Sequence, residues 1–290
     1  MRFSTVGDGF LTVCECSISD RQNLLRFIQF LNDTNVHEKI LQTPFSPSSQ
    51  TWGKWASKSF IGFSSDKIIL KTGFSFDTSV RTNTPTVEHE NNTSTLRKRL
   101  RYLRMALVPP QINVGRTINS EAYKKLHRRF YPNAKYPENE DAIFKIAPMQ
   151  YTLAHEMIEL MQGTITPEKV LEIGPGIGVT AAMHMLRCGT KAVTLIDLPE
   201  TFFTSYIFLR YILPEVKISL PQDFDSSLEQ EDNTIRMILP HQALNLPESL
   251  FDRSINISSF QEMDIDTVDA YLNLSAKLLI PGGSFNSNNQ

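Results

Sequence analysis

The segment that decides the fold is Val170-Leu171-Glu172-Ile173-Gly174-Pro175-Gly176-Ile177-Gly178. Its first four residues have the apolar, β-branched character of a short strand, and the chain then enters a Gly-x-Gly-x-Gly turn. Val179 to Cys188 follows as a predicted helix, which Gly189 ends. Glycines carry no Cβ, so a ligand can approach the backbone, and a helix start presents free amide groups. We therefore predict a ligand-binding strand–turn–helix unit.

Two acidic residues, Glu172 and Asp197, indicate which class of ligand this turn would bind. The dinucleotide fingerprint Gly-x-Gly-x-x-Gly needs a glycine where this chain has Val179. Glu172 precedes the turn, and its carboxylate would repel a pyrophosphate but suits a ligand that carries an ammonium and a sulfonium group. Asp197, at the end of the next predicted strand, is placed to accept hydrogen bonds from ribose hydroxyls. The simpler alternatives are a tight βα turn for the glycines and a helix N-cap for Asp197.

Strands and helices alternate throughout residues 165–290. Further strands are predicted at 192–196, 234–239, 253–257 and 283–286, and helices at 200–213 and 266–279. This order predicts an α/β fold, a Rossmann-like doubly wound parallel sheet with ligands at the carboxyl ends of its strands.

Residues 1–164 have a different pattern of apolar and polar residues, which predicts a mostly helical N-terminal region. Helical spacing of apolar residues predicts one helix over 23–40 and three more near 95–107, 120–130 and 148–161. Residues 67–71 form a short β-like run, and the polar stretch 82–95 predicts an exposed linker.

Composition excludes several classes of protein. Among 290 residues, 29 Lys and Arg against 31 Asp and Glu give a net charge of −2, so no overall field recruits nucleic acid or anionic membrane. Cys14, Cys16 and Cys188 make no disulfide framework and suit a reducing compartment. No apolar run approaches the ~20 residues that span a bilayer, and the start lacks the apolar core of a signal peptide. We expect a soluble, cytoplasmic protein with no nucleic-acid partner.

Three segments together resemble the class I S-adenosylmethionine-dependent methyltransferases. They are Glu172-Ile-Gly-Pro-Gly-Ile-Gly178, Leu195-Ile-Asp-Leu-Pro-Glu200 and Leu279-Ile-Pro-Gly-Gly283, and the resemblance covers residues 168–290. Asp-Leu-Pro-Glu200 with Asn256-Ile-Ser-Ser-Phe-Gln-Glu-Met263 is similar to sugar O-methyltransferases of bacterial surface-polysaccharide loci. The resemblance implies an S-adenosylmethionine-binding domain at 165–290 and a sugar hydroxyl as acceptor. Residues 1–164 would then supply the acceptor side and a homodimer interface.

The resemblance also implies a set of cofactor-binding residues, which lie in turns after the strands: Glu172, Gly174, Pro175, Gly176, Gly178, Asp197, Leu198, His241, Gln242, Asn256 and Ser258. The glycines would line the methionine and ribose, with Glu172 near the amino group. Asp197 would hold the ribose diol, and Leu198 would lie against the adenine. His241 and Gln242 would neighbour the adenine edge, and residues 256–259 would close the pocket near the sulfonium.

Two residues are candidates for the base that methyl transfer to a hydroxyl needs. Glu262 follows the 253–257 strand, although a solvent-facing glutamate at a helix start is the commoner role. His241 is either the base or a ring packed beside adenine. No metal motif is evident, because His155-Glu156-Met-Ile-Glu159 lacks the second histidine of the zinc signature. A magnesium site made of carboxylates from separate parts of the sequence remains an alternative.

Two alternatives to a sugar methyltransferase also remain. The acceptor is open to a small phenolic, lipid or amine metabolite. Methyltransferases of this class continue past the fifth strand with a helix and an antiparallel hairpin, and the sequence lacks these after Asn286. It therefore also fits a truncated, catalytically inactive cofactor-binding or partner protein.

Overall fold

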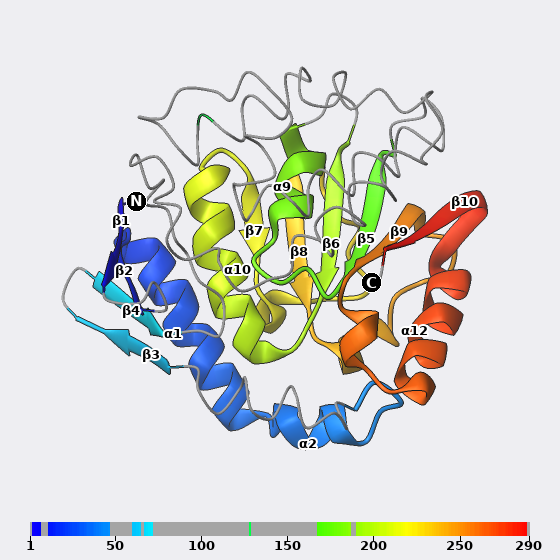
Figure 1. Cartoon of the computed structure of the whole chain (residues 1–290), viewed down its shortest axis with the longest axis horizontal. Coiled ribbons are helices and arrows are strands. Elements are labelled where there is room, and N and C mark those ends of the chain that lie inside the picture. The colour runs from blue at the N-terminus through cyan, green and yellow to red at the C-terminus, as the bar shows by residue number, and fades with distance from the viewer. Residues whose placement is uncertain are drawn as a thin grey trace, which may run out of the picture. The chain divides into compact units, whose positions relative to one another are not determined.

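The computed structural model of the chain (Figure 1) describes residues 2–6, 11–46, 60–64, 67–71, 128, 167–186 and 190–288. The chain divides into two compact units, one made of residues 1–78 together with 165–290 and the other of 79–164. Apart from Arg128, every described residue belongs to the first unit. The predicted helices between 95 and 161 and the predicted linker 82–95 lie outside the described residues.

The first unit is built on a six-stranded sheet in the order β10-β9-β5-β6-β8-β7, with every neighbouring pair parallel. Its strands are β5 (Lys169–Ile173), β6 (Ala192–Ile196), β7 (Lys217–Ser219), β8 (Thr234–Ile238), β9 (Phe251–Ile257) and β10 (Leu279–Asn288). The strand order reverses between β5 and β9, and such switch points are where α/β sheets bind ligands. The predicted Rossmann-like parallel sheet is confirmed.

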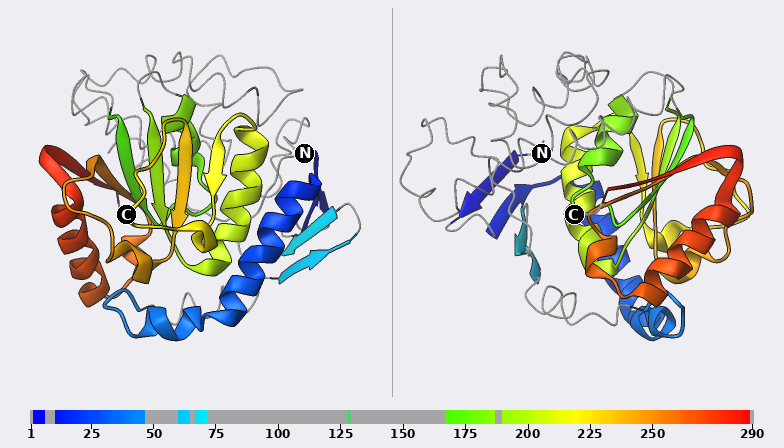
Figure 2. Two further views of the ribbon diagram at one scale, coloured as in Figure 1. Left: turned by 180° about the vertical axis from the view of Figure 1, so that it is seen from behind. Right: turned by 45° about the vertical axis from the view of Figure 1, so that its right-hand side comes forward.

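Helices cover both faces of this sheet. They are α9 (Val179–Leu186), α10 (Pro199–Ile212), α11 (Pro240–Ala243) and α12 (Ile265–Leu278). Figure 2 shows α9 and α10 on one face and α12 on the opposite face. Pro199 stands in the first turn of α10, where its fixed φ suits a helix start. Asp264 caps α12 by accepting a hydrogen bond from the amide of Thr267 at 3.0 Å.

A hydrophobic core packs between the sheet and α12. Its fully or almost fully buried members include Leu171, Ile173, Ile196, Ile238, Phe251, Phe260, Tyr271, Leu274 and Leu278. Phe45 from the N-terminal residues joins this core, with its ring centroid 4.5 Å from that of Tyr271. Burial of these side chains holds β5, β6 and β9 in register, and so fixes where their carboxyl ends lie.

The N-terminal residues of the unit contain two helices and a second, antiparallel sheet. The helices are α1 (Ile18–Asp33) and α2 (Val36–Leu41). The sheet has the order β1-β2-β4-β3, from β1 (Arg2–Val6), β2 (Leu11–Glu15), β3 (Phe60–Phe63) and β4 (Lys67–Lys71). The β-like run at 67–71 is β4, whereas the other three strands were not predicted. The single predicted helix over 23–40 is two helices, because Asn35 between them adopts a left-handed φ of 49°.

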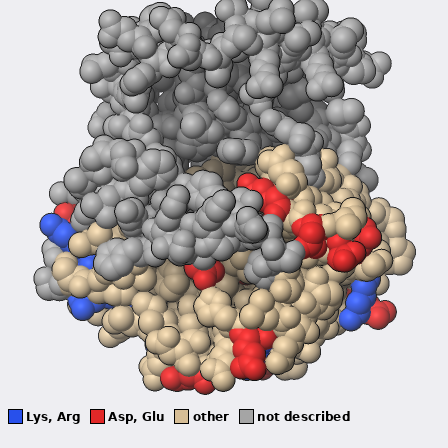
Figure 3. Space-filling model, turned by 60° about the horizontal axis from the view of Figure 1, so that its bottom comes forward, with Lys and Arg blue, Asp and Glu red and all other residues tan. Residues whose placement is uncertain are grey.

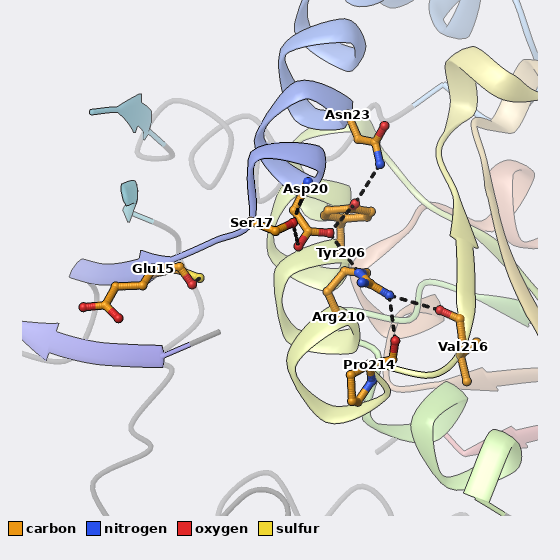
Figure 4. Close-up of polar contacts among 9 residues, drawn as sticks. Glu15, Ser17, Asp20, Asn23, Tyr206, Arg210, Pro214 and Val216 are labelled. Carbon is orange, nitrogen blue, oxygen red and sulfur yellow. Dashed lines mark hydrogen bonds and ion pairs between the residues drawn. The ribbon is translucent and has the colours of Figure 1, made fainter. Parts of the chain in front are cut away.

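Helix α1 packs on α10, far away in the sequence (Figure 4). The Phe27 and Phe203 ring centroids lie 5.1 Å apart. The carboxylate of Asp20 accepts hydrogen bonds from the Tyr206 hydroxyl and the Arg210 guanidinium, both at 2.9 Å. The described residues of the N-terminal segment therefore belong to the same compact unit as the parallel sheet.

Candidate functional site

The glycine turn and Asp197 lie side by side at the carboxyl edge of the sheet. Ile173, the last residue of β5, pairs in register with Ile196, the last residue of β6. The amide of Gly174 donates to the carbonyl of Ile196 at 2.9 Å, and Asp197 is the next residue. Strands β5 and β6 run parallel, so both turns emerge at the lower end of the sheet in Figure 1. The structure thus brings together the two features that the sequence placed at one ligand.

Glu172 is buried just below the glycine turn. This residue is 2% exposed, and its Oε2 has no hydrogen-bond partner among the described residues. Burial raises the pKa of Glu172 to about 8 because desolvation disfavours the charged form. Hydrogen bonds from the Thr180 side chain and the Ala181 amide oppose the rise in pKa, and the charge of Asp197 adds to it. Glu172 is therefore an acid that keeps its proton near neutral pH until a cation or donor approaches.

Asp197 is the second buried carboxyl group of this edge. Its Oδ1 accepts a hydrogen bond from the amide of Leu198 at 2.7 Å, while its Oδ2 has no partner in the described part of the chain. Burial raises the pKa of Asp197 to about 7, and the amides of Leu198 and Gly176 hold the pKa below what burial alone would give. Leaving a buried acceptor unpaired is costly, so Oδ2 is an atom that a ligand hydroxyl would satisfy.

The three glycines of the turn meet different surroundings. A Cβ on Gly174 would lie 2.2 Å from the Ser259 hydroxyl, and one on Gly178 would lie 3.0 Å from Leu209. A Cβ on Gly176 would meet no atom of the described residues within 4 Å, although its φ of 56° is left-handed. A side chain at Gly174 would clash with Ser259 and one at Gly178 would press on Leu209, whereas no atom of the described residues crowds Gly176. A ligand can approach the backbone at Gly176. The carbonyl of Pro175 accepts from the Gly178 amide at 2.9 Å and closes the turn.

Asn256 and Ser258 lie at the end of β9, beside the same turn. The Asn256 side chain is fully buried, donates to the carbonyl of Ile173 at 3.0 Å and also bonds Ser259. Its Oδ1 accepts from the amide of Phe260 at 3.3 Å. Ser258 has a left-handed φ of 66°, and its amide donates to the carbonyl of Asn288. Asn256 therefore ties β9 to β5, and the predicted contact of residues 256–259 with a sulfonium stays a prediction.

His241 and Gln242 lie on α11, directly after β8. The Gln242 Oε1 accepts from the amide of Leu239, and its Nε2 donates to the carbonyl of Pro221, both at 2.9 Å. This side chain is thus occupied in capping α11. The half-buried His241 has a buried Nδ1 that bonds to none of the described residues. Burial, together with the charge of Lys39, lowers the pKa of His241, so its ring is neutral at neutral pH.

The remaining predicted residues are Leu198 and Glu262. Leu198 is the partly exposed residue before α10, and its extended backbone starts that helix. Glu262 ends a 3-10 turn, Phe260–Glu262, between β9 and α12. Its half-buried position raises the pKa of its carboxyl through desolvation. A glutamate with a raised pKa is a stronger base than an ordinary one once it is ionised.

Sequence reasoning missed Ser205, which contacts the glycine turn from α10. Its hydroxyl donates to the carbonyl of Gly176 at 2.5 Å. The only signal was a small polar residue within the apolar run of α10, where ten other residues are buried.

Among the described residues, no three His, Cys, Asp or Glu side chains gather to hold a metal ion. Over the same residues, no helix has the length and apolar character needed to cross a membrane.

No protein-family model and no curated protein sequence matches this chain. Among solved structures, an O-methyltransferase family protein of Burkholderia thailandensis aligns at 12% identity over 92% of this chain and 76% of its own, with a TM-score of 0.36. A Pyrococcus horikoshii protein aligns at 15% identity over 55% of this chain, with a TM-score of 0.34, and the chain spans 63% of that protein's length. Human N-acetylserotonin methyltransferase in complex with SAM aligns at 13% identity over 92% and 77% of the two chains, with a TM-score of 0.30. These likenesses are distant, so the function of this chain has to be inferred from its own residues.

Proposed function

We propose that this chain is an S-adenosylmethionine-dependent methyltransferase. The observation that carries the proposal is the pairing of two buried carboxyl groups, Glu172 and Asp197, at one sheet edge beside the open backbone of Gly176. Each carboxyl group has one oxygen to which no described residue offers a hydrogen bond. A ligand that fits them must bring hydroxyl donors and positive charge, and must lie against the backbone.

S-adenosylmethionine meets these requirements. Its ribose diol offers donors for the Asp197 Oδ2, and its ammonium and sulfonium groups suit the neighbourhood of Glu172. The open side of Gly176 accommodates the ligand where any side chain would intrude. A pyrophosphate fits poorly, because it would place further negative charge beside two carboxyl groups. The residues present therefore fit this cofactor better than a dinucleotide.

The chain's own groups have separate tasks in methyl transfer. The cofactor supplies an electrophilic methyl group. Asp197 and the Gly176 backbone orient the nucleoside, which fixes the direction from which an acceptor must approach. Glu262 and His241 are the two groups that we propose to take the acceptor's proton. His241 is neutral at neutral pH, and Glu262 is half-buried, so both are able to accept a proton after the acceptor has excluded water.

We further propose that the acceptor is a sugar hydroxyl and that the protein works as a cytoplasmic homodimer. Figure 3 supports an acceptor without strong negative charge: the described part of this face carries acidic side chains, while basic ones lie toward its margins. A neutral, polyhydroxylated acceptor suits such a surface. A small phenolic, lipid or amine acceptor is the second candidate, and a screen of acceptors distinguishes them.

Calorimetric titration of the full chain with S-adenosylhomocysteine tests the proposal, with NADH as the comparison ligand. We expect saturable 1:1 binding of S-adenosylhomocysteine and none of NADH. Absence of binding by folded protein would overturn the cofactor assignment. Binding without methyl transfer to any sugar, phenol, lipid or amine acceptor would instead make the chain a cofactor-binding protein without catalysis.

A further inference from the structure

Helix α10 carries two separate connections to the candidate cofactor site. Its first turn follows Asp197 directly, because Leu198 is the residue before the helix. Its second turn presents Ser205, whose Oγ donates to the carbonyl of Gly176 at 2.5 Å. The same helix therefore reaches both the acidic residue after β6 and the open glycine of the turn after β5.

Two carbonyl groups lie within hydrogen-bond distance of the Ser205 hydroxyl. Serine within a helix commonly donates to the carbonyl four residues earlier, and here that carbonyl, of Thr201, lies at 3.0 Å. The carbonyl of Gly176 is closer, and a hydroxyl has only one proton to donate. The Ser205 side chain is fully buried, so water does not replace it as the donor. The bond to Gly176 is thus a fixed contact between α10 and the turn.

The Gly176 carbonyl belongs to the part of the turn where the described residues leave the side-chain position uncrowded. Among the described residues, no atom lies within 4 Å of where a Gly176 Cβ would be, whereas a Cβ on Gly174 or Gly178 would meet Ser259 or Leu209. Its backbone is left-handed, a conformation that a free glycine leaves easily. A hydrogen bond to its carbonyl is therefore an effective restraint on this part of the turn.

Helix α10 is a firm support for this restraint. On its opposite side, Tyr206 and Arg210 both bond to Asp20 of α1, as Figure 4 shows. Phe203 packs against Phe27 of the same helix α1. The residue next to Ser205 is thus anchored to α1, which limits how far Ser205 can move.

We propose that Ser205 is a positioning residue for the cofactor: it holds the Gly176 carbonyl against α10, so that the open side of Gly176 and the carboxylate of Asp197 face one nucleoside. The inference rests on the proposed function for its ligand, but the restraint on the turn is a property of the free protein. Loss of the hydroxyl should loosen residues 174–178 before any ligand is added.

The test compares Ser205→Ala with Thr204→Val. Thr204 is the neighbouring buried residue, and its hydroxyl makes no hydrogen bond to any residue that the structure describes, so its removal is a matched control. Hydrogen exchange of the amides in residues 174–178 is measured in the free proteins, and S-adenosylhomocysteine affinity is measured across pH 6–9. Ser205→Ala should exchange faster in this segment and bind roughly tenfold more weakly. Thr204→Val should match the parent protein in both measurements.

The pH profile separates positioning from general loosening. If Ser205 keeps the Gly176 amide near Asp197, its removal raises the pH at which Asp197 ionises and affinity increases, because an amide near the carboxylate favours its charged form. Glu172 and Glu200, the other acids that act on Asp197 or the ligand, are present in both proteins, so the comparison isolates the change at Asp197. General loosening would lower affinity equally at every pH, and that result would overturn the proposal. Ser205→Cys, with a similar volume and a weaker donor, serves if the alanine variant unfolds, and should give intermediate exchange and affinity.

The two proposals fail differently. If the parent protein does not bind S-adenosylhomocysteine, the proposed function fails and hydrogen exchange alone decides the role of Ser205. If the parent binds and Ser205→Ala exchanges and binds as the parent does, the positioning role is wrong while the function stands.

Discussion

Glu172 and Asp197 point to the same side of two neighbouring parallel strands. Glu172 pairs in register with Leu195, and Asp197 follows Leu195 by two residues, so their side chains share one face of the sheet. Both are buried, and the charge of Asp197 helps to raise the pKa of Glu172. Burying these two carboxyl groups side by side therefore costs electrostatic free energy, and a ligand with donors or positive charge would reduce that cost.

The first prediction concerns stability in the Glu172→Gln variant. The pKa of Glu172 in the folded protein is about 8 against an ordinary 4.5, so the folded state holds a proton that the unfolded state has released. Stability from this group is greatest below pH 4.5 and falls as pH rises toward 8, by at most about 1.4 kcal/mol per pH unit. In denaturant unfolding, the free energy of unfolding of Glu172→Gln should rise relative to that of the parent protein between pH 5 and pH 8.5. A difference that stays constant with pH would contradict the raised pKa, and the exposed Glu248→Gln is the control.

The second prediction concerns Asp197→Asn. Replacing the carboxylate removes a charged acceptor from the ribose hydroxyls, which should weaken S-adenosylhomocysteine binding by about 1–3 kcal/mol. Calorimetry measures the loss, and Asp269→Asn, an exposed aspartate on α12, should bind as the parent does. Unchanged affinity in Asp197→Asn would leave this residue only the role of bonding the Leu198 amide.

The third prediction is that ligand binding releases protons. Near pH 7, Glu172 is mostly protonated and Asp197 partly so, because burial raises their pKa values to about 8 and about 7. A cationic ligand favours the charged forms and should expel on the order of one proton. Titrations with S-adenosylmethionine at pH 7 in buffers of different ionisation enthalpy should give different heats. Equal heats in all buffers would count against ligand contact with these carboxyl groups.

The fourth prediction separates two glycines of the same turn. Gly176→Ala places a methyl group in open space at a left-handed φ, so it should cost only about 1 kcal/mol of stability while weakening cofactor binding strongly. Gly174→Ala drives its methyl into Ser259 and should destabilise the protein more, by about 1–3 kcal/mol. Thermal unfolding and calorimetry on both variants check this order. Tight binding by Gly176→Ala would place the ligand elsewhere.

The fifth prediction concerns the contact of α1 with α10. Burial tends to raise the pKa of Asp20, but hydrogen bonds from Ser17, Arg210 and Tyr206 and the guanidinium charge outweigh it and lower the pKa. This contribution to stability is present above the ordinary pKa and is lost as pH falls through the lowered one. Asp20→Asn should therefore cost about 1–3 kcal/mol at pH 7 and less in acid, as measured by denaturant unfolding.

A surface ion pair provides the contrast for Asp20. Asp223 pairs with Arg26, and both side chains are substantially exposed, at 36% and 58%. Exposed pairs contribute little, so Asp223→Asn should cost less than about 1 kcal/mol. If the two variants lose equal stability, the Asp20 network is not the anchor of α10 that we infer.

The parallel sheet was predictable because its strands and helices are strongly patterned. Strand β6 is the predicted 192–196, and helix α12, at Ile265–Leu278, lies one residue from its predicted bounds. Strand β7 was missed, since Lys217–Ser219 is short and partly exposed. The break between α1 and α2 was missed because apolar spacing continues through it, while a single left-handed residue, Asn35, decides it.

The candidate site was predictable in outline and not in detail. Parallel strands place Glu172 and Asp197 at one edge, which the sequence pattern indicates. The spacing of residues does not indicate which hydrogen bonds a side chain makes. The side-chain amide of Gln242 bonds to the backbone of Leu239 and Pro221, and the Ser205 hydroxyl donates to the carbonyl of Gly176. Contacts such as Asp20 with Arg210 join residues 190 positions apart, and no local signal indicates them.

The most direct test of the central claim is a crystal structure of the full chain with S-adenosylhomocysteine. We predict ribose hydroxyls within hydrogen-bond distance of the Asp197 Oδ2, the nucleoside against the Gly176 backbone, and the ligand's amino group on the side of Glu172. Density for the ligand at any other place, with Asp197 and Gly176 untouched, would contradict the account.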